Sequence, residues 1–251
     1  MMYFAQRPLM YPGTAFAGDV PGNPPWGEIV KLGTPDGERL FALHSRAETG
    51  RPTILFFHGN ADRITQYGFL AHGLASRGIG LLAVSYRGFT GSTGFPTEEG
   101  LLIDGLTAHD WLASQTDGPI VLLGQSLGSG VAVHLAAERP GVAGVMLVSA
   151  FDSIVNLAAS IYFFLPVRPL IKDSFRSDLR IAEVRQPKLF IHGQRDAVIP
   201  IRHGQALFDM APEPKQMIVY DAFGHNDIWG DGLMADVIAF VESIQQDQGA
   251  T

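Results

Sequence analysis

A serine set between two glycines is the feature of this sequence that points most directly to chemistry. The motif GQSLG at 124–128 directly follows an apolar run at 119–123 and directly precedes a helical pattern. A sharp passage from a strand into a helix forces the middle residue into a strained conformation, and flanking glycines leave room for such a turn. We therefore expect the Ser126 hydroxyl to stand exposed above a sheet, where it can act as a nucleophile.

A serine nucleophile needs a base within hydrogen-bond reach and a carboxylate that orients this base. Of the eight histidines, His225 lies in the loop after the last predicted strand. Loops at the carboxyl ends of parallel strands are where such sheets gather their sites, so we expect His225 to be the base. Asp196 follows the seventh predicted strand and is the expected acid, whereas Asp152, just after the sixth, is the competing acid.

Attack on a carbonyl group also requires N–H donors for the oxygen that becomes negative. The N–H of Leu127 opens a helix, where unsatisfied donors and the positive end of the helix dipole favour an anion. A second donor is expected in the loop after the third strand, where Gly59 permits a tight turn and the Asn60 N–H faces the same point. His58 is expected to hold this loop by hydrogen bonds.

Several other chemistries fit the sequence poorly. The chain contains no cysteine, which excludes thiolate nucleophiles, disulfides and cysteine-ligated metals. His58, Asp62, His225 and Asp227 do not have the spacing of a helix-borne pair of metal ligands, and the glycine-rich stretch 88–94 lacks the lysine of a P-loop. We therefore expect no metal and no cofactor. A net charge of -7 argues against a nucleic-acid partner.

Alternating strands and helices must position these residues. Hydrophobic residues make up 46% of the 251 residues and charged residues 17%, which is typical of a folded chain and excludes disorder. The later strands are apolar on both faces, as in a parallel sheet covered by helices, whereas 39–44 alternates and suits an antiparallel edge. The predicted strands are 28–32, 39–44, 53–57, 79–85, 119–123, 144–149, 187–192 and 215–220, and the predicted helices are 62–77, 98–115, 127–138, 201–210 and 231–245.

Two segments depart from this alternation. Residues 1–27 are rich in proline, glycine and aromatic residues and are expected to form an irregular arm over a single domain, 28–251. An insertion at about 152–186 is much longer than usual connections and is expected to form a short cap. Its centre, Tyr162, Phe163, Phe164 and Leu165, is interpreted as buried packing, as the wall of an apolar substrate pocket or as a membrane-facing lip.

The same motifs occur together in a known family. In chain order they are QRPLMYP at 6–12, HGNA at 58–61, YRGFTGSTG at 86–94, EEG at 98–100, GQSLG at 124–128, Asp196 and GHND at 224–227. This set resembles the short-cap abhydrolase serine hydrolases, which include bud-emergence and depalmitoylase-like proteins and many bacterial hydrolases. The resemblance implies that Ser126 is the nucleophile, Asp196 the acid and His225 the base, and that Asn60 and Leu127 supply the oxyanion-hole donors.

The resemblance and the residues lead to one set of expectations. The fold class is α/β, an α/β-hydrolase fold with an eight-stranded, mostly parallel sheet, helices on both faces and a short cap after strand six. The expected activity is hydrolysis of small-molecule carboxylic esters or thioesters, of short to medium acyl or lipid-like type, through an acyl-enzyme on Ser126. The alternatives are a serine peptidase of the same fold and a non-catalytic lipid- or ligand-binding protein.

The expected location follows from the absence of targeting signals in the sequence. Neither a signal peptide nor an apolar run long enough to span a bilayer is visible, and the anchor helix that precedes the arm in many relatives is not seen. We expect a cytoplasmic protein or one peripheral to a membrane, which it would contact through the N-terminal arm or the cap. The sequence leaves open the physiological substrate and the oligomeric state.

Overall fold

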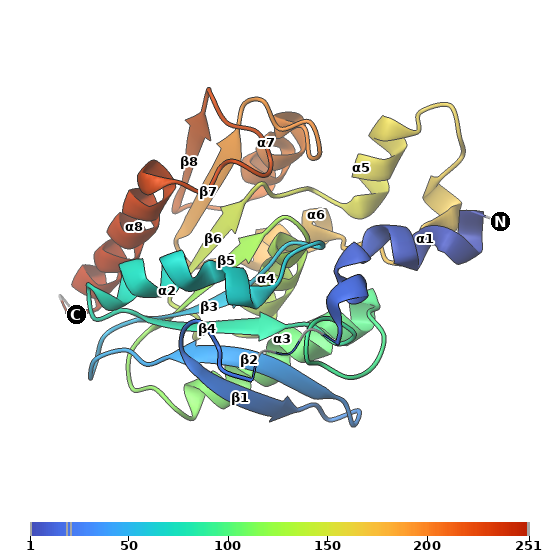
Figure 1. The fold of residues 1–251 in the computed structure, drawn as a ribbon. Helices are drawn as coiled ribbons and strands as arrows, with labels where there is room; N and C mark the ends of the chain where they lie inside the picture. The colour runs from blue at the N-terminus through green and yellow to red at the C-terminus, as the bar shows by residue number, and fades with distance from the viewer. Residues whose placement is uncertain (1, 19, 21, 250–251) are drawn as a thin grey trace.

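An eight-stranded sheet forms the centre of the molecule (Figure 1). The computed structural model describes residues 2–18, 20 and 22–249. The strands are β1 (Glu28–Gly33), β2 (Arg39–Ser45), β3 (Thr53–Phe57), β4 (Gly80–Ser85), β5 (Ile120–Gln125), β6 (Gly144–Val148), β7 (Lys188–Gly193) and β8 (Lys215–Tyr220).

The strand order β1-β2-β4-β3-β5-β6-β7-β8 combines an antiparallel edge with a parallel remainder. The pairs β1–β2 and β2–β4 are antiparallel, and the pairs from β4 to β8 are parallel. Every residue of β3, β4, β5, β6 and β7 is buried, because helices cover both faces of these strands. The predicted fold class, including the mostly parallel eight-stranded sheet, is confirmed.

Helices on the two faces enclose two hydrophobic cores. One core lies against α2 (Gly68–Ala75) and α8 (Asp231–Gly249), and the other against α3 (Glu98–Ala113), α4 (Leu127–Glu138) and α7 (Ile201–Met210). The start of α3 is favoured by Thr97, whose hydroxyl accepts the Gly100 N–H, and by two glutamates in the first turn. The predicted helix 62–77 is divided into a 3-10 turn, Ile64–Tyr67, and α2. Among the described residues, no helix combines the length and the apolar content that crossing a membrane requires.

The N-terminal arm is more regular than the sequence predicts. It forms α1 (Met2–Met10) and a 3-10 turn (Pro12–Phe16), and Tyr11 between them is fully buried. Side chains of α1 bind the segment that follows β6, since the Gln6 amide donates to the Leu170 carbonyl at 2.7 Å and the Arg7 guanidinium to Asp173 at 2.9 Å. These tertiary contacts stabilise a short helix that local signals alone do not indicate.

The cap lies between β6 and β7, as expected. It contains α5 (Ile154–Ile161), a 3-10 turn (Arg168–Leu170), α6 (Ser177–Arg180) and a second 3-10 turn (Ile181–Glu183). Figure 1 shows α1 and the cap together on one side of the sheet, beyond the carboxyl end of β6. The arm and the cap therefore form one continuous part of the surface.

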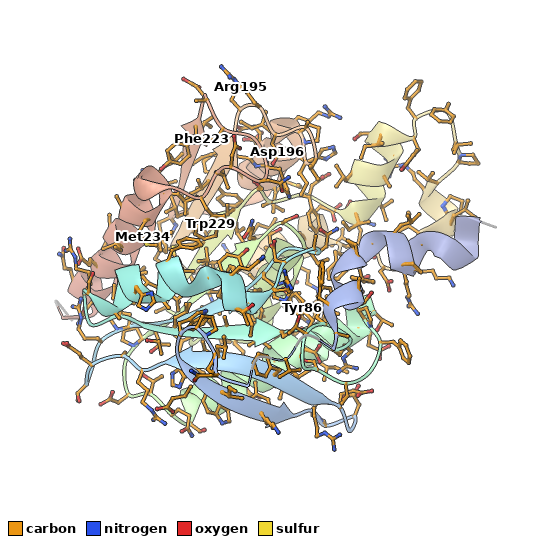
Figure 2. The ribbon with its side chains drawn as sticks, in the orientation of Figure 1. Tyr86, Arg195, Asp196, Phe223, Trp229 and Met234 are labelled. Carbon is orange, nitrogen blue, oxygen red and sulfur yellow. The ribbon has the colours of Figure 1, made fainter. Side chains whose placement is uncertain are left out.

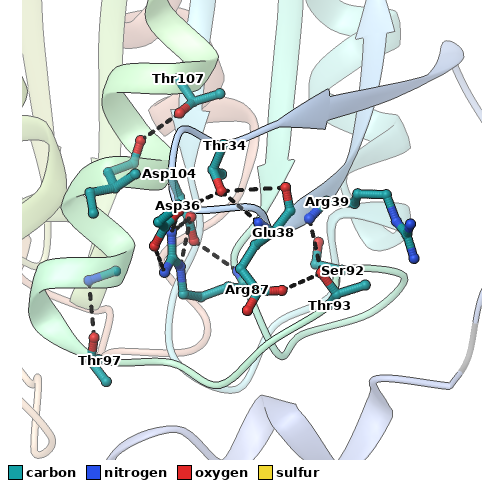
Figure 3. A network of polar contacts seen from close by, with 12 residues as sticks. Thr34, Asp36, Glu38, Arg39, Arg87, Ser92, Thr93, Thr97, Asp104 and Thr107 are labelled. Atoms are coloured by element: carbon teal, nitrogen blue, oxygen red, sulfur yellow. Dashed lines mark hydrogen bonds and ion pairs between the residues drawn. The ribbon is translucent and has the colours of Figure 1, made fainter.

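A buried arginine holds the loop after β4 (Figure 3). The Arg87 guanidinium binds Asp104 of α3 at 2.8 Å and Asp36 of the β1–β2 turn at 2.6 Å. Asp104 is fully buried and also accepts the Arg87 backbone N–H at 2.8 Å. The network fixes a loop whose neighbouring residue, Tyr86, donates its hydroxyl to the His58 carbonyl at 3.1 Å.

We expect Arg87→Ala to lower the free energy of unfolding by about 3 to 5 kcal/mol, because it leaves the carboxylate of Asp104 buried without its cation. Urea denaturation followed by circular dichroism measures this change. Arg46→Ala is the matched control, since Arg46 forms an exposed pair with Glu28 and its loss should cost less than about 1 kcal/mol. Equal losses in the two variants would contradict the expectation.

Candidate active site

Ser126 occupies a strained turn between β5 and α4. Its backbone angles are φ 51° and ψ -117°, a region that residues other than glycine rarely adopt. The glycines of the motif are required by close packing: a Cβ on Gly124 would lie 2.4 Å from the Gly128 carbonyl oxygen, and a Cβ on Gly128 would lie 2.0 Å from that of Phe57. Ser126 as a whole residue is 7% exposed, and its Oγ faces Nε2 of His225.

The side chains of Ser126, His225 and Asp196 lie in one hydrogen-bonded row. His225 Nε2 is 3.1 Å from Ser126 Oγ, and His225 Nδ1 is 2.7 Å from Asp196 Oδ2. With Nδ1–H donating to the carboxylate, the neutral imidazole presents Nε2 as the acceptor for the serine hydroxyl. The structure thus brings together three residues that the sequence places on separate loops.

Asp196 is held as a carboxylate. Its Oδ1 accepts the backbone N–H groups of Val198 at 2.9 Å and Ile199 at 2.7 Å, which leaves Oδ2 for the histidine. Burial alone would raise the pKa of Asp196, but the hydrogen bonds from His225 and Ile199 outweigh it and hold the pKa below its ordinary value. Figure 2 shows Arg195, the preceding residue, extending outward, whereas Asp196 lies farther inside.

The backbone N–H groups of Asn60 and Leu127 are free for a ligand. Neither donates a hydrogen bond within the part of the chain that the structure describes. The loop of Asn60 lies against the serine turn, since a Cβ on Gly59 would be 3.7 Å from the Ser126 Cβ. The first turn of α4 in turn packs on the end of β3, through the contact of Gly128 with Phe57. Both donors therefore lie close to the serine.

Comparison with known proteins identifies the family. Residues 48–176 match the model of the family described as serine aminopeptidase, S33. The uncharacterized protein Rv2307c of Mycobacterium tuberculosis is 38% identical over 88% of this chain and 81% of its own. The human alpha/beta hydrolase domain-containing protein 17B is 33% identical over 80% of this chain and 70% of its own. The chain belongs to the α/β-hydrolase domain family.

Solved structures share the fold of this α/β-hydrolase. The hydrolase GrgF from Penicillium superposes with a TM-score of 0.70 at 18% identity, covering 87% of this chain and 99% of its own. The Pyrococcus furiosus esterase Pf2001 superposes with a TM-score of 0.67 at 17% identity, covering 86% of this chain and 89% of its own. The chain is thus a hydrolase-family member with an esterase-like fold.

The N-terminal arm of this α/β-hydrolase contacts the loop of Asn60 directly. The Asn60 carbonyl accepts the Gly13 N–H at 2.9 Å, and the Asn60 side-chain amide donates to the Met10 carbonyl at 3.1 Å. His58 holds the loop from within, because its Nδ1–H donates to the Gly59 carbonyl at 2.7 Å. Burial lowers the pKa of His58 and keeps its ring neutral. The contact with the arm is a feature that sequence analysis missed.

Gln125 connects the serine turn to neighbouring segments, and sequence analysis missed this role. Its side-chain oxygen accepts the Trp229 indole N–H at 2.9 Å and lies 2.8 Å from the Tyr67 hydroxyl. Trp229 follows His225 by four residues, so this contact ties the histidine loop to the serine turn. The polar side chain inside GQSLG is the only sequence signal for it.

Asp152, the competing acid, belongs to a different array. It lies 2.7 Å from Nδ1 of His203, whose Nε2 is 3.0 Å from Oγ of Ser160. Ser160 is within α5, not in a strained turn, and its hydroxyl donates to the Leu157 carbonyl at 2.9 Å. These contacts fasten the cap helix to α7. Neither His203 nor Ser160 was identified from the sequence.

The four residues predicted at the centre of the cap lie at its outer end. Phe163 is 84% exposed and Phe164 68%, with Tyr162 and Leu165 also exposed. This exposure contradicts the interpretation of the run as buried packing, because the chain turns outward after α5. A substrate-binding or membrane-facing role of these residues stays a prediction.

Proposed function

We propose that this protein is a serine hydrolase that cleaves carboxylic esters or thioesters through an acyl-enzyme on Ser126. The observation that carries the proposal is the position of His225 between Ser126 and Asp196. Its Nε2 lies 3.1 Å from Ser126 Oγ and its Nδ1 lies 2.7 Å from Asp196 Oδ2. Nucleophile and base are within hydrogen-bond reach, and a third group orients the base, which is the arrangement that nucleophilic catalysis requires.

In the first half of the reaction, Ser126 Oγ attacks the carbonyl carbon while its proton passes to His225 Nε2. Asp196 holds the imidazole in the required tautomer and stabilises the imidazolium ion that forms. The carbonyl oxygen becomes negative and accepts hydrogen bonds from the N–H groups of Asn60 and Leu127, which are free in the structure. Collapse of this intermediate breaks the bond to the leaving group, which takes the proton from His225.

In the second half, water removes the acyl group. His225 accepts a proton from the water molecule as it attacks the acyl carbonyl, and the same two N–H groups stabilise the second oxyanion. Collapse releases the carboxylic acid and returns the proton to Ser126. The chain's own residues thus supply each proton transfer of the cycle, with no cofactor.

The proposed substrates are small esters or thioesters with a short to medium acyl chain or a lipid-like character. The support for an acyl ligand is the apolar composition of α5 in the cap, which lies beyond the carboxyl end of the sheet. A serine peptidase is the second candidate, because the family whose model matches residues 48–176 is described as a serine aminopeptidase. Esters and amides react by the same two steps, so substrate tests must separate them.

A fluorophosphonate probe tests the proposal directly. We expect the probe to label Ser126, as located by mass spectrometry of the digested protein. Within the described part of the chain, only this serine combines a strained turn, a base and free N–H donors. A panel of p-nitrophenyl esters of increasing chain length, acyl thioesters and aminoacyl p-nitroanilides then ranks the substrate classes. Absence of labelling in folded protein would favour a non-catalytic ligand-binding protein and overturn the proposal.

A further inference from the structure

The outer end of the cap exposes apolar side chains in one place. We call this set the cap tip: Ile161, Tyr162, Phe163, Phe164 and Leu165, each between 37% and 84% exposed. The preceding helix, α5, is rich in apolar residues and yet has no fully buried residue. Soluble domains rarely gather so many apolar side chains in contact with water unless the surface has a partner.

The arm extends the cap tip on one side. Leu9 of α1 is 75% exposed, and α1 is fastened to the cap by the bond from Gln6 to Leu170. Figure 1 shows α1 and the cap projecting from the same side of the sheet. The helix that carries the exposed Leu9 and the cap, which are far apart in sequence, therefore project on the same side of the molecule.

Two arginines near this surface bind neutral partners although the protein as a whole is acidic. Residues 153–172 contain Arg168 and Lys172 and no Asp or Glu, and the flanking carboxylates of Asp152 and Asp173 bind His203 and Arg7. Arg168 binds the neutral amide of Asn156 at 2.9 Å, and Arg202 of α7 binds the neutral hydroxyl of Ser160 at 3.1 Å. Neither partner compensates the charge of the guanidinium group, and Ser160 directly precedes the cap tip in sequence.

We propose that the cap tip, with Leu9 and the cations Arg168, Lys172 and Arg202, docks on an anionic lipid bilayer. Aromatic and aliphatic side chains partition into the interface between headgroups and acyl chains, and arginine and lysine bind anionic headgroups. A second copy of this chain fits less well, because a symmetric contact would bring the same cations face to face. The exposed aromatic rings lie near Arg168 and Arg202, whose hydrogen-bond partners Asn156 and Ser160 are neutral, and this combination favours a lipid surface.

Docking by this surface has a consequence for the candidate active site. Met10 follows Leu9, and its carbonyl binds the Asn60 side chain beside Ser126. The arm and the cap border the candidate active site on one side. The bilayer would therefore contact the protein on that same side. The docking surface itself does not rest on the proposed hydrolysis, because its test measures binding alone.

Vesicle flotation tests the proposal. The protein is mixed with vesicles of phosphatidylcholine alone, or of phosphatidylcholine and phosphatidylglycerol in equal parts, and the floated fraction is measured. We expect the wild type to float with the mixed vesicles and to be released by high salt, because the cations bind anionic headgroups. Binding should be at least about tenfold weaker on phosphatidylcholine alone.

Two double variants separate the apolar and the charged contributions. Phe163→Ser/Phe164→Ser and Arg168→Glu/Lys172→Glu should each weaken binding to mixed vesicles by at least about tenfold. The matched controls, Ile29→Ser and Arg46→Glu, alter exposed side chains at the far edge of the sheet and should bind like the wild type. Because all these side chains are exposed, circular dichroism should show unchanged folding.

Three results would overturn the docking surface. The first is a failure of the wild type to float with the mixed vesicles. The second is binding to mixed vesicles that both double variants retain in full. The third is a dimer in light scattering that is lost in Phe163→Ser/Phe164→Ser without any vesicle binding, which would assign the surface to a second copy. Fluorophosphonate labelling is read separately, so either proposal can fail while the other stands.

Discussion

Ser126→Ala should lower kcat for ester hydrolysis by about a millionfold, a loss on the order of that caused by removing the nucleophile of a serine hydrolase. The reason is that no other hydroxyl occupies the strained turn between β5 and α4, 3.1 Å from His225 Nε2. Initial rates with the best p-nitrophenyl ester of the panel, at saturating substrate, measure the effect. The fold should be unaffected, because alanine is smaller than serine and the turn is held by its glycines.

Ser160→Ala is the matched control for this experiment. It makes the same change in the other Ser–His–Asp row, where Ser160 Oγ lies 3.0 Å from His203 Nε2. That row has no strained turn, and the Ser160 hydroxyl already donates to the Leu157 carbonyl. We expect Ser160→Ala to keep activity within a few-fold of the wild type. If Ser160→Ala lost most of its activity while Ser126→Ala retained it, the nucleophile would have to be assigned to Ser160 in the cap.

Asp196→Asn should lower kcat by about ten-thousandfold. The amide oxygen would keep the bonds from the backbone N–H groups of Val198 and Ile199, so the NH2 group would take the place of Oδ2. This NH2 group donates to His225 Nδ1, and the imidazole loses the tautomer that presents Nε2 as an acceptor to Ser126. The wild-type carboxylate is ionised well below neutral pH, because its hydrogen bonds hold the pKa below its ordinary value. We therefore expect the loss to persist at every pH from mildly acidic to alkaline, as measured by kcat in a series of buffers.

The alternative acid supplies the control for this second prediction. Asp152→Asn changes a carboxylate that also binds a histidine at 2.7 Å, but that histidine is His203 of α7. We expect this variant to retain activity within a few-fold and to loosen the cap, since Asp152 also binds Asn156 of α5 at 2.6 Å. If Asp152→Asn were the inactive variant, the assignment of the acid would be wrong.

Local patterns were sufficient to predict the strands of the sheet. Runs such as 53–57 and 215–220 coincide with β3 and β8 because strand length, β-branched content and flanking turn residues are all encoded within a few positions. The turn at Ser126 could also be predicted from the sequence, since Gly124 and Gly128 each lie two positions from the serine. Each glycine is required by contacts within the turn or with β3. The helix in the arm could not be predicted from local patterns, because α1 depends on contacts with Leu170 and Asp173.

The partners of the histidines were not determined by local patterns. Asp152 and Asp196 both follow parallel strands, and each lies 2.7 Å from a histidine nitrogen in the structure. Chain order favoured Asp196, and the loop position of His225 favoured it over His203, but only the arrangement of the loops shows which acid lies beside which histidine. Nothing in the sequence indicated that a second serine, on α5, would complete a similar row.

By itself the sequence determined the order of strands and helices, the glycine-flanked turn and a set of residues able to act together. These features depend on neighbours along the chain, where backbone geometry and side-chain periodicity act. Only the tertiary structure decided which acid meets which histidine, how the arm holds the Asn60 loop and that the cap tip is exposed. Those outcomes depend on contacts such as Met10 with Asn60 and Gln125 with Trp229, which join residues 50 and 104 positions apart. Such contacts form only when the packed core brings distant segments within hydrogen-bond range.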